Sequence, residues 1–188
     1  MSAAGRLKYA YLAYLSKPRE LRSFYRQIRR KKPHRIVELG IRSLDDTLRM
    51  LSVAARYQTS RPIEYTAIDL FDARSEDCAP LGLKQAHQVL KSAGVKARLL
   101  PGIPSQTLPA VANTLLNTDL LIISQDGADA NDPIGPAWFF VPRMLCPEST
   151  ALRRIERCDA EGNITLTLDP VDSADIAKHA VPQRRRAA

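Results

Sequence analysis

The chain has 188 residues, a mass of 20.9 kDa and a formal net charge of +8 at pH 7. Hydrophobic residues make up 45% of it and charged residues 26%, which is typical of a globular domain and excludes a wholly disordered, collagen-like or coiled-coil chain. A chain of this length buries roughly 70% of the surface that its unfolded form exposes, so it needs no disulfide or metal for stability.

The positive charge is concentrated at the N-terminus. Residues 1–35 contain eleven Lys or Arg and a single acid, which gives a net charge of +10. Residues 36–183 contain 14 bases and 19 acids, a net charge of −5, and the last bases are the three arginines at 184–186. The sequence therefore predicts a mildly acidic body with a basic arm, and the arm is the place where we expect contact with a polyanion.

The cysteines and apolar runs predict the cellular compartment of the protein. Cys78, Cys146 and Cys158 show no C-x-x-C spacing, so we expect neither a disulfide framework nor a zinc knuckle. No apolar run approaches the roughly 18–20 residues of a membrane span, and the first residues lack the apolar core of a secretory signal. We expect a cytoplasmic protein with no membrane partner.

Residues 1–32 are predicted to form a helical arm in two pieces. Apolar residues recur at helical spacing in each piece, and Pro18 between them fits a stop and a restart. The spaced residues are Leu7, Tyr11 and Tyr14, followed by Leu21, Phe24 and Ile28. Because each piece has an apolar side, we expect the arm to pack on the body.

The body, residues 33–170, alternates strands with helices. A β-branched run at 35–40 ends at a glycine, and apolar residues then recur at helical spacing until Pro62 interrupts them. The same alternation continues through predicted strands at 65–69, 95–100 and 119–123. Such alternation predicts right-handed crossovers and a doubly wound, mostly parallel α/β sheet with helices on both faces.

The last third of the chain has a different pattern. Residues 152–157 and 164–168 flank a turn-forming segment, which predicts an antiparallel hairpin at the end of the sheet. The segment from Trp138 to Val141 is compatible with a helix or a loop. Little indicates structure in residues 171–188, which we expect to be a poorly ordered tail.

Candidate binding residues follow the predicted strands. In an open parallel sheet, ligands bind outside the carboxyl ends of the strands. These ends carry glycines, which let a backbone approach a ligand closely, and acids, which accept hydrogen bonds from ribose hydroxyls or an ammonium group. The residues at these four ends are Glu38, Leu39 and Gly40; Asp69 and Leu70; Gly102 and Ile103; and Ser124, Gln125, Asp126 and Gly127.

The motifs at 37–40, 67–69, 99–102 and 119–123 resemble those of class I S-adenosylmethionine-dependent methyltransferases, in a match that covers residues 35–127. The nearest branch begins with E-I-G-x-x-x-G-x-S/T, and its sheet ends in an antiparallel pair. The resemblance implies S-adenosylmethionine as the cofactor. It implies that the methionine part of the cofactor lies near Glu38 and Gly40 and that Asp69, beside Leu70, binds the ribose hydroxyls. The adenine would lie near Gly102 and Ile103, and the transferred methyl group would face Ser124 and Asp126.

This sequence departs from the family pattern at two places. Leu44 stands where the family has its second glycine, so the glycine-rich motif is eroded, and Arg42 could bond the cofactor's carboxylate or fill the pocket entrance. Ser124 stands where the family commonly has an aspartate that binds metal in its metal-dependent members, and Asp126 comes two residues later. We therefore expect no metal.

Methyl transfer requires alignment and, for an oxygen or nitrogen nucleophile, a base. Asp126 is the base that we predict, ahead of Asp129 and His87. A nucleotide-dependent oxidoreductase would need G-x-G-x-x-G at the first turn, which is absent, and acids at 45 and 46 would repel a phosphate there.

Two functions follow. The first is a methyltransferase that acts on a small molecule, with residues 1–32 and 128–150 over the substrate. The alternative is a catalytically degenerate, methyltransferase-like binding module whose basic arm contacts nucleic acid or another polyanion. The sequence predicts no oligomeric state.

Overall fold

The structure, a computed structural model, describes residues 7, 9–17, 19, 21–58, 60–76, 78–125, 134–158 and 164–180. The strands are β1 (Arg35–Leu39), β2 (Glu64–Asp69), β3 (Lys96–Pro101), β4 (Thr118–Gln125), β5 (Leu145–Cys158) and β6 (Ile164–Val171). The helices are α2 (Leu21–Lys31), α3 (Leu44–Tyr57), α4 (Leu83–Ser92), α5 (Pro104–Val111), α6 (Val141–Met144) and α7 (Ser173–His179). Shorter π- or 3₁₀-turns are η1 (Tyr11–Leu15), η2 (Phe71–Ala73), η3 (Ala112–Thr114) and η4 (Gly135–Phe140).

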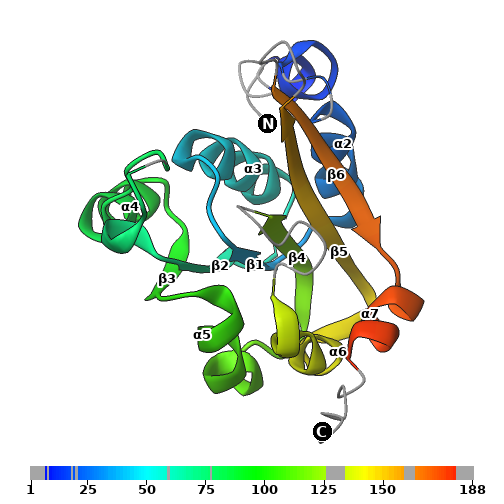
Figure 1. The fold of residues 1–188 in the computed structure, drawn as a ribbon. Coiled ribbons are helices and arrows are strands. Elements are labelled where there is room, and N and C mark those ends of the chain that lie inside the picture. The colour runs from blue at the N-terminus through cyan, green and yellow to red at the C-terminus, as the bar shows by residue number, and fades with distance from the viewer. Residues whose placement is uncertain are drawn as a thin grey trace, which may run out of the picture.

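The six strands form one sheet in the order β3-β2-β1-β4-β5-β6 (Figure 1). All neighbours pair in parallel except β5 and β6, which form an antiparallel hairpin. The chain moves outward from β1 to β3 and then returns to the other side of β1 with β4, so the strand order reverses between these two central strands. The predicted α/β fold, with its parallel sheet and terminal hairpin, is confirmed.

Both faces of the sheet are covered. Figure 1 shows α2, α3 and α4 on one side and α5, α6 and α7 on the other. Alternate residues of the central strands supply the two cores, because successive side chains point to opposite faces. In β4, for example, Leu120 and Ile122 pack with α3, while Leu121 and Ile123 pack with Trp138 and Met144. None of the helices in the described part of the chain is long and apolar enough to cross a membrane.

The N-terminal segment packs on the body, as expected. Phe24, Tyr25 and Ile28 of α2 are almost fully buried in the same core as α3. The first helical piece, however, packs through Tyr9 and Leu12, while the side chains of Leu7, Tyr11 and Tyr14 are more than half exposed. Both sets of residues are apolar at helical spacing, but the set that we expected to pack on the body, Leu7, Tyr11 and Tyr14, faces outward.

The predicted disorder of the tail is wrong for residues 173–179. These residues form α7, whose first turn is capped by the Asp172 carboxylate accepting a hydrogen bond from the backbone N–H of Asp175 at 2.7 Å. Ile176 is 7% exposed and packs in the core that contains Trp138, and the His179 ring stacks on that Trp138 at 5.2 Å. Residues 181–188 lie outside the described part of the chain.

Candidate functional site

The ends of β1, β2, β3 and β4 meet at one edge of the sheet. Leu39 pairs with Ile68 on one side and Ile123 on the other, and Asp69 pairs with Pro101. The predicted residues at 38–40, 69–70, 102–103 and 124 are therefore neighbours along this edge, which we call the carboxyl edge. Asp126 and Asp129, the first two predicted bases, lie outside the described residues.

Glu38 lies inside the molecule, beneath the carboxyl edge. Its side chain has no exposed surface, and its carboxylate accepts hydrogen bonds from Tyr65 Oη at 2.7 Å, Thr47 Oγ1 at 3.0 Å and Arg154 Nη1 at 2.8 Å. The Arg154 side chain is 3% exposed, so this ion pair is fully removed from water. Burial, reinforced by the charge of Glu38, raises the pKa of Tyr65 well above its usual value.

Ser124 joins the same network from β4. Its hydroxyl accepts a hydrogen bond from Arg154 Nη1 at 3.2 Å. Arg154 thus reaches from β5 beneath β4 to β1, and it ties the hairpin to the centre of the sheet. The polar groups predicted to face the methionine part and the methyl group are held by a single buried arginine.

Asp69, the predicted ribose-binding acid, is 4% exposed and has a full set of partners. The backbone N–H groups of Ile41 and Phe71 donate to it at 2.6 and 2.9 Å. Arg74 donates twice, from Nε to Oδ1 at 2.8 Å and from Nη2 to Oδ2 at 2.7 Å. A carboxylate offers about four lone-pair positions, so all of them are used within the chain.

The turn after β1 is fixed by its own contacts. Gly40 has a φ of 79°, which favours glycine, and its N–H donates to the carbonyl of Ile68 at 2.8 Å. Arg42 turns back onto the start of α3, where its Nε donates to Asp46 at 3.0 Å, and Ser43 caps the helix. In this structure Arg42 is thus part of the helix start, and its predicted contact with a cofactor carboxylate stays a prediction.

Two apolar side chains are exposed beside Asp69. Leu70 follows β2 and is 38% exposed, and Ile103 follows the neighbouring strand β3 and is 43% exposed. Gly102 precedes Ile103 with a φ of 140°, and a Cβ there would lie 2.4 Å from Thr107 Oγ1, so this turn requires a glycine. A flat apolar ring could rest on Leu70 and Ile103 within reach of Asp69.

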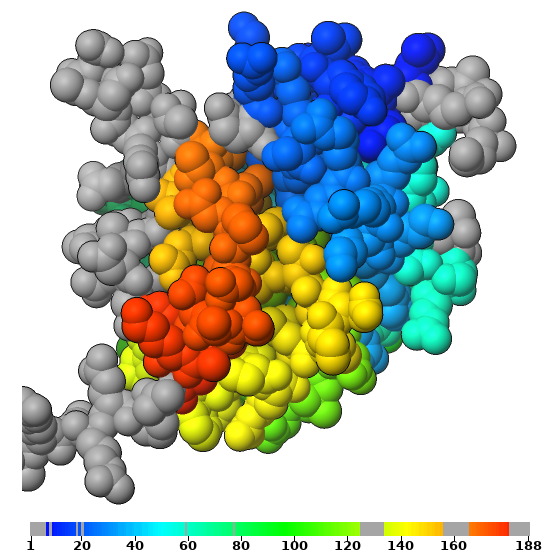
Figure 2. All heavy atoms as spheres, turned by 90° about the vertical axis from the view of Figure 1, so that its right-hand side faces the viewer, coloured from blue at the N-terminus to red at the C-terminus, as the bar shows by residue number. Residues whose placement is uncertain are grey.

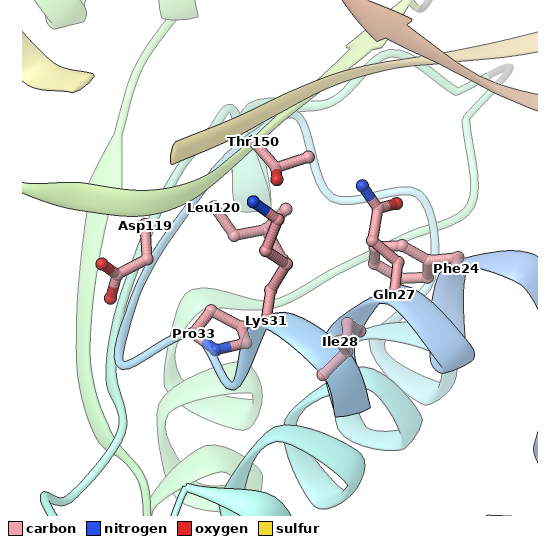
Figure 3. Close-up of a pocket in the computed structure, with 8 residues that line it drawn as sticks. All are labelled: Phe24, Gln27, Ile28, Lys31, Pro33, Asp119, Leu120 and Thr150. Atoms are coloured by element: carbon pink, nitrogen blue, oxygen red, sulfur yellow. The ribbon is translucent and has the colours of Figure 1, made fainter. Parts of the chain in front are cut away.

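Two hollows lie at the opposite edge of the sheet. One, of about 10 Å³, lies between α2 and the amino end of β4, with Lys31 reaching over it toward Thr150 (Figure 3). It is large enough for about one water molecule. The other, of about 260 Å³, lies between α7 and the amino end of β5, beside Cys146. Neither hollow includes a residue predicted for cofactor binding.

Two arginines at the carboxyl edge, Arg74 and Arg154, were not among the predicted site residues. Arg154 could have been found, because it stands two residues after the buried Leu152 in a strand and therefore points to the same apolar face. Arg74 lies after η2 in a segment without periodicity, so nothing in the pattern marks it. His87, the third predicted base, is exposed on α4 and has no contact with Glu38, Asp69 or Ser124 among the hydrogen bonds of the described residues.

Comparison with known proteins finds the same fold among solved structures. No protein-family model matches the sequence, and no curated protein matches it. Solved structures do match: a proposed O-methyltransferase from Klebsiella pneumoniae has a TM-score of 0.51 and 16% identity over 96% of this chain and 75% of its own. Cofactor-bound Rv0187 from MTB has a TM-score of 0.50 and 18% identity over 81% of this chain.

A SAM-dependent methyltransferase from Agrobacterium tumefaciens has a TM-score of 0.50 and 12% identity over 75% of this chain. The chain spans 63% of the length of Rv0187 and 46% of that of the Agrobacterium protein. At these identities the likeness concerns the fold. The chain has the fold of class I S-adenosylmethionine-dependent methyltransferases.

Proposed function

We propose that the chain binds S-adenosylmethionine at the carboxyl edge and transfers its methyl group to a small molecule. The observation that carries the proposal is the grouping of exposed Leu70 and Ile103 around Asp69, at the ends of two adjacent strands. It supplies an apolar surface for the adenine at the end of β3 and a carboxylate for the ribose hydroxyls at the end of β2, outside the carboxyl ends of the strands where ligands of this fold bind.

The residues fit such a cofactor on one condition. The two backbone donors, at Ile41 and Phe71, orient the Asp69 carboxylate without closing the site. The other two acceptor positions are used by Arg74, whose side chain is 11% exposed. Ribose hydroxyls can take these positions only if Arg74 leaves them. Cofactor binding is therefore linked to the release of Arg74 from Asp69.

The bound cofactor would supply an activated methyl group, which a nucleophile displaces from sulfur. The chain has to align that nucleophile and exclude water. The fixed turn at 40–43 forms the floor of the edge near β1, and Asp126, after β4, is proposed to accept the nucleophile's proton.

A second candidate function is a methyltransferase-like module that binds no S-adenosylmethionine. Two observations favour it: Arg154 neutralises Glu38, and Arg74 neutralises Asp69. Both acids expected at the cofactor site are then occupied by arginines of the same chain, which hold the edge closed.

Calorimetric titration with S-adenosylhomocysteine distinguishes the two functions. We expect micromolar binding at a 1:1 ratio, weakened more than about tenfold by Asp69→Ala, because charge-assisted hydrogen bonds worth about 1.5–3 kcal/mol are lost. Glu76→Ala, which removes an exposed acid from the same loop, is the control and should bind like the wild type. Absence of binding at millimolar ligand, in the wild type and in a variant lacking the Arg74 side chain, would overturn the first function and leave the second.

A further inference from the structure

Helix α2 presents a strongly basic outer face. Residues 21–32 contain six Lys or Arg and no acid. The apolar side chains of α2 are all buried against the body, so the outward side consists of bases and small polar groups. Figure 2 shows this segment, in blue, lying open on the surface of the molecule. We define the α2 basic face by four exposed residues, Arg26, Arg29, Arg30 and Lys32.

The fold makes little use of these charges. Among the residues that the structure describes, no acid forms an ion pair with any base of α2. Two neighbouring bases do have structural contacts: Arg22 Nε donates to the carbonyl of Ser16 at 2.8 Å, and Lys31 Nζ to that of Glu148 at 3.4 Å. Bases in the last turn also stabilise a helix through its dipole, but Arg26 lies before that turn.

Tyrosine rings orient two guanidinium groups of this face, those of Arg26 and Arg29. Arg29 lies over the rings of both Tyr9 and Tyr57, at 5.2 and 5.5 Å from their centroids. Arg26 lies over Tyr14 at 5.8 Å, and the Tyr14 side chain is itself 53% exposed. Stacked guanidinium groups lose little freedom on binding a phosphate with their edges, and an exposed ring offers a face to a base.

We propose that the α2 basic face binds the backbone of a single-stranded nucleic acid, with Tyr14 stacking against a base. Arg26, Arg29 and Arg30 lie within little more than one helical turn, about 6 Å along the axis. They supply two or three neighbouring phosphate contacts, and an aromatic ring beside a basic track is the arrangement that binds single strands without base-specific contacts. This surface does not depend on whether the carboxyl edge binds a cofactor.

The nearest competing partner is an anionic lipid surface. Leu7 and Leu15, in the segment before α2, are 72% and 67% exposed, and apolar groups beside bases are typical of helices that bind membranes. On α2 itself, however, the apolar residues are buried and none could enter a lipid layer. The observations on α2 therefore favour a nucleic acid.

Fluorescence anisotropy with a labelled 12-nucleotide oligo(U) tests the proposal on the full chain. We expect affinity to fall about twentyfold between 50 and 200 mM salt, a slope near −2, because each phosphate contact on a single strand contributes about −0.7. The variant R26Q/R29Q/R30Q should bind at least about tenfold more weakly in low salt and lose most of that slope. Tyr14→Ala should weaken binding about fivefold or more while leaving the slope unchanged.

The matched control is K84Q/K91Q/K178Q, which removes two exposed bases from α4 and one from α7. It has the same net charge as the α2 variant and should bind like the wild type. Equal loss in both triple variants would reduce the effect to net charge and overturn the proposal. Binding to vesicles with 30% anionic lipid but not to oligo(U), or binding to neither, would overturn it as well.

Discussion

Arg74 and Asp69 form a two-point ion pair at the end of β2, with Nε 2.8 Å from Oδ1 and Nη2 2.7 Å from Oδ2. This fork geometry gives the strongest hydrogen bonds that arginine makes. Arg74 also donates to the carbonyls of Ile41 and Ala79, so it connects the turns after β1 and β2. The acid expected to bind a ribose is therefore also the anchor of the loop that covers it.

Removing this arginine should separate stability from binding. We expect Arg74→Gln to lower the melting temperature, because Asp69 is left buried with fewer partners, and to strengthen S-adenosylhomocysteine binding by about tenfold or more, because its competitor is gone. Arg74→Lys keeps the charge but cannot donate two parallel hydrogen bonds, so its melting temperature and its affinity should lie between those of the wild type and Arg74→Gln. Differential scanning fluorimetry and calorimetry measure the two effects, and a variant that binds more weakly than the wild type would contradict the linkage.

The buried pair of Glu38 and Arg154 should be among the most sensitive points of the fold. Arg154→Met leaves a carboxylate inside the protein without its cation, which typically costs about 3–5 kcal/mol. Adding Glu38→Gln should recover much of the lost stability, since the uncompensated charge is removed. Urea unfolding measures both. Lys96→Met, which breaks an exposed pair with Glu64, should cost less than about 1 kcal/mol.

Buried tyrosines should make the protein less stable in alkali. Burial, with the charge of Asp46 adding to it, raises the pKa of Tyr25 to about 12. An unfolded tyrosine loses its proton near pH 10, so above pH 10 the folded state binds more protons and stability falls as the pH rises.

The fall amounts to about 1.4 kcal/mol per pH unit for one such tyrosine between pH 10 and 12. Urea midpoints at pH 9, 10 and 11 should show it. Tyr25→Phe should make the profile less steep, with the buried Tyr65 still contributing, while Tyr11→Phe, at an exposed position, should leave it as steep as in the wild type. Identical profiles for Tyr25→Phe and the wild type would show that this side chain does not contribute.

Gly102 should tolerate no side chain. An added Cβ would lie 2.4 Å from Thr107 Oγ1, and the φ of 140° is itself strained for any other residue, at a cost of about 1–3 kcal/mol. Gly102→Ala should therefore lower the free energy of unfolding by at least that amount, with Thr107→Ala relieving only the clash. Gly82→Ala is the control, because Gly82 has a φ of −71° and the nearest atom to its added Cβ, Asp72 Oδ1, would lie 3.4 Å away. Equal losses at the two glycines would argue against a strained turn.

The sheet and its helices could be predicted because buried faces leave a period in the sequence. The run at 120–123 is apolar throughout, as a strand covered on both faces must be, and it is central in the sheet. Periodicity could not choose between Leu7–Tyr11–Tyr14 and Tyr9–Leu12, since both stripes are apolar. It also could not show that Arg74 faces Asp69, because that contact depends on how an aperiodic loop folds back.

The ion pair of Glu38 and Arg154 joins residues 116 positions apart. While the chain is being made on a ribosome, Glu38 emerges long before its partner, and β1 cannot bury that carboxylate without cost until β5 has been synthesised. The central strand is therefore completed only when the hairpin arrives. The sheet should close late in synthesis as one unit, and a chain that stops short of β5 should remain open and exposed to proteases.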